Sequence, residues 1–120
     1  MFIKDVKNGR AFTAGDGSHL KEIFNPVKEK LAFRYSLAWA EVPARGATRP
    51  HRLTSSEVYF ILEGEGEMHI DAEREAIGPG RAVYIPPGAR QWVENTGRGE
   101  LRFLCLVDPA WRPEDEEILA

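Results

Sequence analysis

The sequence predicts an all-β fold, and three observations support this prediction. Short segments rich in Val, Ile, Tyr and Phe recur along the whole chain. Glycines and prolines separate these segments at short intervals. No helical pattern of several turns lies between them. Short strands at regular spacing, with turn residues between them, are typical of β-sandwiches and β-barrels.

Length and composition restrict the possible classes of protein. The chain has 120 residues, of which 42% are hydrophobic and 29% are charged, so we expect a single globular domain over 1–120. The net charge of −3 disfavours a nucleic-acid partner, because such binding depends on neutralising phosphates. The sequence shows neither a signal-peptide pattern nor an apolar stretch of membrane-spanning length. We therefore expect a cytoplasmic protein without a membrane partner, and its lone Cys105 excludes an internal disulfide.

The first third of the chain contains two predicted elements. Residues 18–24 are interpreted as one or two helical turns, with Ser18 as the cap and Asn25-Pro26 as the stop. Residues 31–42 then alternate with a period of two. Bulky apolar residues occupy the odd positions, and small or polar residues occupy the even ones. This alternation predicts a half-buried strand.

Five further strand segments follow, each ending at turn residues. β-branched and aromatic residues dominate them, as is usual in strands. Turns are predicted where Gly, Pro, Asn or charged residues cluster, at 63–66, 72–75, 86–88 and 95–97. The predicted strands are 58–62, 68–70, 82–85, 91–94 and 101–107.

Two stretches of the sequence carry a more specific pattern. In the first, Gly46 is followed by His51, Glu57 and Gly64; in the second, Gly80 is followed by Pro86, Gly88, Gln91 and Asn95. These stretches resemble the two motifs of the cupin superfamily, here about fifteen residues apart, as in small single-domain microbial cupins. The resemblance implies a double-stranded β-helix, which is a jelly-roll barrel of two antiparallel sheets, with its core motifs at 46–95.

The resemblance also implies a metal site that has lost two of its ligands. Cupins bind one divalent metal through two His and one Glu of the first motif and one His of the second. Here His51 and Glu57 keep their places, whereas Leu53 and Gln91 stand where the other two His would be. One hypothesis is a site for Zn, Mn, Fe or Ni formed by His51, Glu57 and Gln91 with water. The other is a metal-free pair in which Glu57 orients His51 as a general base. Only two other histidines could substitute as ligands, namely His69 and, less favoured, His19.

Strand periodicity indicates which side chains face the barrel interior. The apolar face of 101–107 carries Cys105, so this thiol is expected inside. If Glu57 points inward, Tyr59 does too, and Trp92 is a second candidate wall residue. Arg49 shares its parity with His51, so we expect it to point inward and to suit a carboxylate or phosphate. The predicted substrate-binding residues are Arg49, Tyr59, Gln91 and Cys105.

These residues lead to two hypotheses about function. The first is a barrel pocket for a small polar or anionic, sugar- or carboxylate-like molecule, with His51 and Glu57 as catalytic residues. If the protein is an enzyme, a metal-dependent isomerase or lyase is favoured over a dioxygenase, and no organic cofactor is expected. The alternative is a metal-free small-molecule binding module without catalysis. Fold analogy also implies a homodimer, formed by sheet packing or strand exchange, to which the stripe 31–39 and Phe2-Ile3 could contribute.

Overall fold

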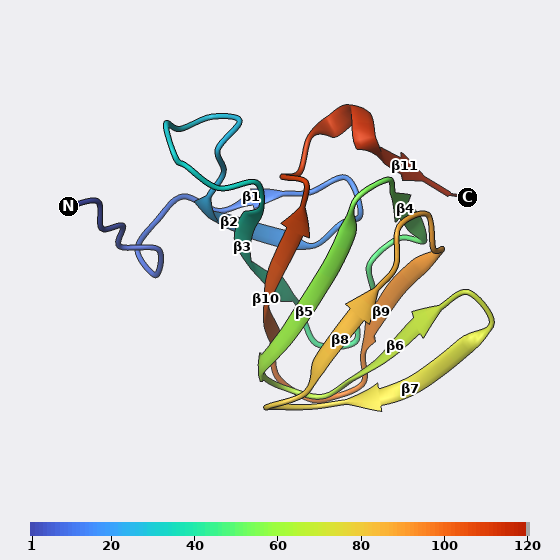
Figure 1. Cartoon of the computed structure of the whole chain (residues 1–120). Coiled ribbons are helices and arrows are strands. Elements are labelled where there is room, and N and C mark those ends of the chain that lie inside the picture. Colours follow the sequence, from blue (N-terminus) through green and yellow to red (C-terminus); the bar gives the residue numbers. More distant parts are fainter. Residues whose placement is uncertain (120) are drawn as a thin grey trace.

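Two antiparallel sheets face each other across one hydrophobic core in the computed structural model, which describes residues 1–119 (Figure 1). The first sheet has six strands in the order β1-β2-β3-β10-β5-β8, and the second has five in the order β11-β4-β9-β6-β7. The only helical element in this range is the short 3-10 helix η1. The all-β jelly-roll prediction is therefore confirmed. The strands are β1 (Phe12–Thr13), β2 (His19–Phe24), β3 (Ser36–Val42), β4 (His51–Leu53), β5 (Ser56–Glu63), β6 (Gly66–Ile70), β7 (Glu73–Ile77), β8 (Ala82–Ile85), β9 (Gln91–Asn95), β10 (Leu101–Asp108) and β11 (Glu116–Ile118), and η1 is Pro113–Asp115.

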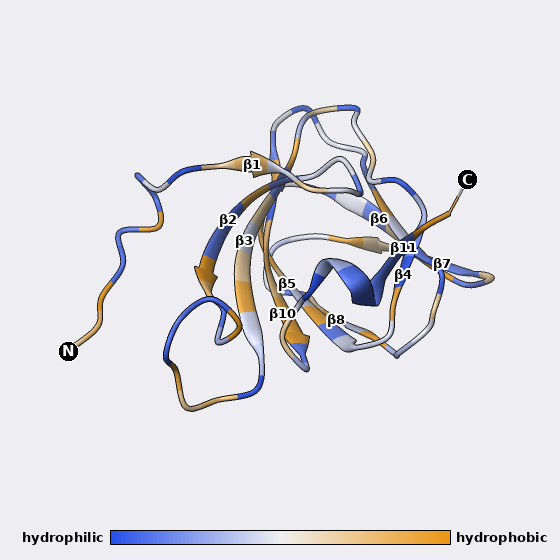
Figure 2. Ribbon diagram, turned by 90° about the horizontal axis from the view of Figure 1, so that it is seen from above, coloured by the Kyte–Doolittle hydropathy of each residue, from blue (hydrophilic) through white to orange (hydrophobic). Residues whose placement is uncertain are grey.

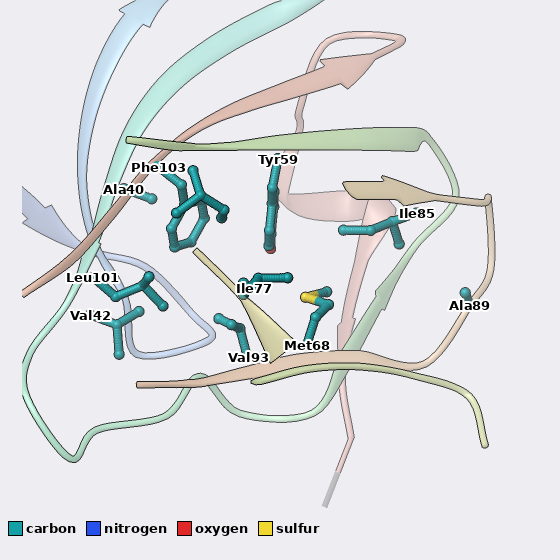
Figure 3. Packing of buried hydrophobic residues seen from close by; sticks show 11 residues of the cluster. Ala40, Val42, Tyr59, Met68, Ile77, Ile85, Ala89, Val93, Leu101 and Phe103 are labelled. Carbon is teal, nitrogen blue, oxygen red and sulfur yellow. The ribbon is translucent and has the colours of Figure 1, made fainter. Parts of the chain in front are cut away.

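The core lies between the two sheets and is built from alternate residues of the central strands (Figure 3). Tyr59 of β5 and Phe103 of β10 are neighbours in the six-stranded sheet, with ring centroids 4.4 Å apart. Met68 and Val93 approach them from the opposite sheet. Burial of Tyr59 and Phe103 confirms the inward faces predicted for 57–61 and 101–107.

The helical prediction for residues 18–24 is wrong, because His19–Phe24 form β2. This strand pairs with β3 in an antiparallel register that places Leu20 opposite Ala40. Pairing with a neighbouring strand satisfies the backbone of β2, and this tertiary contact overrides a weak local helical pattern. The consequence for the site is direct, because β2 becomes one wall of the barrel.

The strand predicted over 31–42 is shorter in the structure, where β3 covers only Ser36–Val42. Its interior face consists of the small or polar even positions, with Ala40 paired to Phe103. The Phe103 ring fills the barrel at this level, so a small partner is required. Trp39 lies on the other face, half-buried, and its indole N–H donates to Glu41 Oε1 at 3.0 Å.

The β6–β7 connection is tighter than predicted, because 73–75 belong to β7 rather than to a turn. The chain reverses at Asp71 and Ala72, and Asp71 has a left-handed φ of 52°. The predicted turn over 63–66 agrees with the structure, where Gly64 has a φ of 90°.

The two terminal segments of the chain take different courses relative to the barrel. The N-terminal segment runs away from the barrel before β1 begins (Figure 2). The C-terminal segment crosses the opening and adds β11 to β4, with Ile118 opposite His51. No helix in residues 1–119 is long and apolar enough to cross a membrane.

Candidate functional site

A cavity of about 200 Å³ opens between the first strands and the C-terminal segment. Its walls come from β1, β2, β3, β4, β5 and β10, from the loop between β1 and β2, and from the segment around β11. Five of the predicted site residues lie in or next to this cavity. His51, Glu57, Tyr59 and Cys105 line it, and Gln91 lies directly behind Glu57.

A continuous hydrogen-bond network lies at the base of the cavity and joins the side chains of Tyr59, Gln91, Glu57 and Cys105. Gln91 Nε2 donates to Glu57 Oε1 at 2.7 Å, and the Tyr59 hydroxyl donates to Gln91 Oε1 at 3.1 Å. The Cys105 thiol donates to Glu57 Oε2 at 2.7 Å. The amide nitrogen of Gln91 thus faces a carboxyl oxygen, which accepts the hydrogen bond. Three strands, β5, β9 and β10, thus hold one carboxylate.

Burial dominates the electrostatics of this network. It raises the pKa of the Glu57 carboxyl, while hydrogen bonds from Cys105 and Gln91 and the nearby His51 offset part of that shift. Burial also raises the pKa of the Cys105 thiol well above its usual value, and the neighbouring Glu57 adds to the rise. The pKa of Tyr59 is raised for the same two reasons. Cys105 and Tyr59 are therefore protonated donors at neutral pH.

His51 belongs to β4, opposite Gln91 in β9, and its side chain is only 3% exposed. Its Nδ1 lies 2.7 Å from the carbonyl oxygen of Arg49. A carbonyl oxygen only accepts, so Nδ1 carries the proton in the neutral ring and Nε2 has the lone pair. Nε2 has no hydrogen-bond partner among residues 1–119, and it lies 3.7 Å from Asp16 Oδ2. The ring is thus oriented as a proton acceptor that faces the cavity.

Asp16 is a site residue that sequence reasoning missed. Its Oδ1 accepts from the backbone N–H of Ser18 at 2.9 Å and from the Ser18 hydroxyl at 2.6 Å. The Asp16 carbonyl oxygen accepts from the Arg49 backbone N–H at 2.6 Å, which fixes the loop beside β4. The local signal was the Gly15–Ser18 run, in which an Asp accepts from a backbone two residues on. Nothing in the sequence, however, places this turn next to His51.

The prediction for Arg49 is wrong with respect to its orientation. The Arg49 side chain is exposed and does not line the cavity. No Lys or Arg side chain of residues 1–119 lines it. Parity failed here because Arg49 precedes β4, where the alternation of a regular strand does not yet apply. The charge expected to attract an anionic ligand is therefore outside the site.

His69 and Trp92 lie on the outer face of the five-stranded sheet. Their rings stack with centroids 3.7 Å apart, and His69 Nε2 is 3.1 Å from Glu67 Oε1. Met68, the preceding residue of β6, occupies the core face. His69 therefore cannot substitute as a metal ligand in the barrel, and Trp92 is not a wall of the cavity. His19 is exposed at the start of β2 and also takes no part in the site.

The donor groups of the cavity do not fit a divalent metal. Within residues 1–119 no three His, Cys, Asp or Glu side chains are grouped to share an ion. Leu53, buried at the position of the second family His, offers no donor atom. Both oxygens of Glu57 and the carbonyl oxygen of Gln91 already accept hydrogen bonds. A metal held by these residues would have to break the network, and only one imidazole would compensate.

The jelly-roll barrel, the glycines at its turns and the remnant His–Glu pair define a cupin. The family model for the cupin domain matches residues 38–107, and the chain belongs to this family. It is 39% identical over 111 residues to an uncharacterised protein of Methanocaldococcus jannaschii, covering 92% of this chain and 88% of the relative. It is also 35% identical over 51 residues to an oxalate-binding protein of Thermotoga maritima, covering 42% of each chain.

A solved structure supports the same fold. The polyketide cyclase RemF from Streptomyces resistomycificus superposes with a TM-score of 0.82. The sequence identity is 22%, and the match covers 100% of this chain and 86% of the cyclase. At this identity the likeness establishes the shared barrel only, so the chemistry of the cavity has to be argued from its own residues.

Proposed function

We propose that this cupin binds a small molecule in its barrel cavity and transfers a proton to and from it through His51, without a metal ion. The observation that carries the proposal is the state of the imidazole. Its Nδ1 is held by a backbone carbonyl, whereas its Nε2 lone pair faces the cavity next to Asp16. A buried base with a fixed tautomer and a nearby carboxylate is suited to general acid–base catalysis.

The proton transfer needs no further group from outside the cavity. Nε2 takes a proton from an acidic C–H bond of the bound molecule, and the ring becomes an imidazolium that Asp16 stabilises electrostatically. Return of that proton to a different carbon completes an isomerisation. Return to a departing group completes an elimination. Both reactions are isomerase or lyase reactions, as the sequence favoured, but they proceed here without the metal expected there.

Glu57 serves as a positioning residue in this proposal. Its carboxylate holds Gln91 and Cys105, and Gln91 in turn pairs with His51 through the β4–β9 register. The network keeps the base of the cavity rigid, and its hydrogen-bonding capacity is used internally. Arg49 is not part of the proposed site. The ligand is accordingly an uncharged or cationic small molecule rather than an anion.

The test compares chelator-treated protein with protein incubated with Zn, Mn, Fe or Ni. We expect no stoichiometric metal by elemental analysis, and proton-transfer activity in an isomerase and lyase screen that survives chelation. His51→Gln is expected to lower that activity at least a hundredfold. His69→Gln is the matched control, because it removes an imidazole outside the barrel. Activity that appears only after metal addition would overturn the proposal.

We also propose that two copies pair through the outer face of the six-stranded sheet. Phe60 of β5 and Tyr84 of β8 are 42% and 63% exposed there, and Leu62 extends the same apolar face. The stripe over 31–39 is less suited to this role, because Phe33 stacks on Tyr35 and packs against Phe24 within the same chain. Phe2 also contacts Phe24.

A further inference from the structure

The cavity is lined by acidic groups and by no Lys or Arg side chain of residues 1–119. Asp16, Glu22, Glu57 and Glu116 contribute carboxyl groups to the lining, and His51 contributes the only imidazole. Two of the four carboxyl groups already have partners within the protein. Glu57 is enclosed by its own hydrogen bonds, and Glu22 lies 3.3 Å from the ammonium group of Lys28.

The other two carboxylates keep an oxygen available to a ligand. Asp16 uses Oδ1 for Ser18, and its Oδ2 accepts no hydrogen bond from residues 1–119. Glu116 uses Oε2 for the indole N–H of Trp111, at 3.0 Å, and its Oε1 is likewise without a donor from that range. His51 Nε2 also faces the cavity without a hydrogen-bond donor from that range, and the side chain that carries it is only 3% exposed.

The rest of the lining is mainly apolar and partly aromatic. Phe103, Leu53 and Val107 form the inner wall, and Trp111 and Phe12 stand nearer the opening. Such walls bind an apolar body by excluding water from it. Aromatic faces are also favourable neighbours for an organic cation. The cavity thus combines apolar walls with acceptor atoms that have no donor in the protein. Such a cavity favours a molecule with an apolar body and a positively charged hydrogen-bond donor.

We infer that the ligand of this cavity is a small organic amine, with its ammonium group held by Asp16 Oδ2 and Glu116 Oε1 next to His51 Nε2 and its apolar body against the aromatic wall. This inference rests on the proposed cavity function and deepens it by naming the ligand class. An ammonium group carries only hydrogen-bond donors, so it complements acceptor atoms that have no donor within the protein. A carboxylate or phosphate in the same place would face unpaired negative charge instead.

Three probes of matched size and different charge test the inference, namely 2-phenylethylamine, 2-phenylethanol and phenylacetate. Their affinities are measured by calorimetry at neutral pH on the full chain after chelator treatment. We expect the amine to bind at least tenfold more tightly than the alcohol, because charge-assisted hydrogen bonds are the stronger ones. Phenylacetate is expected to bind more weakly than the alcohol.

Variants then locate the binding. Asp16→Asn and Glu116→Gln are each expected to weaken amine binding about tenfold while changing alcohol binding less than twofold. The matched control is Glu117→Gln, which makes the same change in net charge on an exposed neighbour outside the cavity. It is expected to leave amine affinity within twofold. If Asp16→Asn fails to fold, Glu116→Gln carries the test.

The contrary outcomes are distinct from those of the proposed function. Phenylacetate binding as tightly as the amine would overturn the amine inference. An equal loss of amine affinity in the Glu117→Gln control would also overturn it, because the effect would then come from net charge alone. The same holds if none of the three probes binds. The metal analysis and the His51→Gln activity test remain separate measurements, so the proposed proton transfer stands or falls independently.

Discussion

Gln91 explains how this barrel holds a buried carboxyl group without a Lys or Arg beside it. A histidine at this position would offer one donor and one acceptor in a fixed ring, whereas the amide places its nitrogen on Glu57 and its oxygen on Tyr59. The exchange of His for Gln therefore turns a ligand position into a hydrogen-bond bridge. The Tyr59 hydroxyl, Gln91 Nε2 and the Cys105 thiol each have an acceptor, so the polar groups of the network are satisfied by one another.

Replacing Gln91 by Leu should be strongly destabilising. The change leaves Glu57 buried with one donor fewer and leaves the Tyr59 hydroxyl without its acceptor. We expect the free energy of unfolding to fall by about 2–4 kcal/mol, as for a buried charged group that loses a partner. Tyr59→Phe removes only the outer bond and should cost about 1 kcal/mol. Urea denaturation of both variants measures the difference, and equal stabilities would contradict the bridging role.

Glu57 should make stability depend on pH in a defined direction. Burial raises its folded-state pKa above the ordinary value of a glutamate, so the folded protein binds this proton more tightly than the unfolded chain does. Its contribution is fully favourable below the unfolded pKa and is lost as pH rises through the folded pKa. Glu57→Gln keeps the shape but cannot ionise. Relative to wild type, this variant should therefore gain stability as pH rises through that window and then level off. Denaturation curves across the range provide the test, and a pH-independent difference would contradict it.

Individual strands of the barrel depend on glycines at their ends for different reasons. Gly64 begins the β5–β6 turn with a φ of 90°, and a Cβ there would lie 2.5 Å from the backbone oxygen of Glu100. Gly80 has a similar φ of 86° but nothing within 4 Å of a Cβ. Gly64 is required both because its φ is positive and because a side chain would collide with the neighbouring backbone. Gly80 is required only because its φ is positive.

A pair of alanine substitutions separates these two reasons. Gly80→Ala should lose about 1 kcal/mol of stability, which is the cost of a left-handed φ for an L-residue. Gly64→Ala should lose several kcal/mol, roughly 3 or more, because the backbone of β10 must also move. Thermal or urea unfolding of both variants compares them. A similar loss in both would show that the close approach to Glu100 relaxes freely.

At the scale of the molecule, the two faces of the six-stranded sheet have different tasks. The inner face builds the core and the cavity. The outer face presents the apolar side chains of Phe60, Leu62 and Tyr84 to solvent on the neighbouring strands β5 and β8. A second copy of the chain is the symmetric way to cover it.

The dimer proposal is tested by light scattering coupled to size-exclusion chromatography. We expect the wild-type chain at twice its monomer mass. Tyr84→Lys should shift it to the monomer, since a charge would be buried at the centre of the pair. Val27→Lys is the control, because Val27 is 59% exposed on a loop away from that sheet face. A monomeric wild type, or a dimer that survives Tyr84→Lys, would contradict this face as the interface.

The sequence alone determined the barrel and the inner half of its site. Motif spacing predicted the cupin fold, and strand parity correctly placed Tyr59 and Cys105 inside, because alternation is a local property of an extended chain. Tertiary structure alone decided the outer half of the site. Asp16 lies beside His51 although 35 positions separate them in the sequence, and β2 is a strand because it pairs with β1 and β3. Such contacts depend on which distant backbone satisfies each segment, and a local pattern does not record that choice.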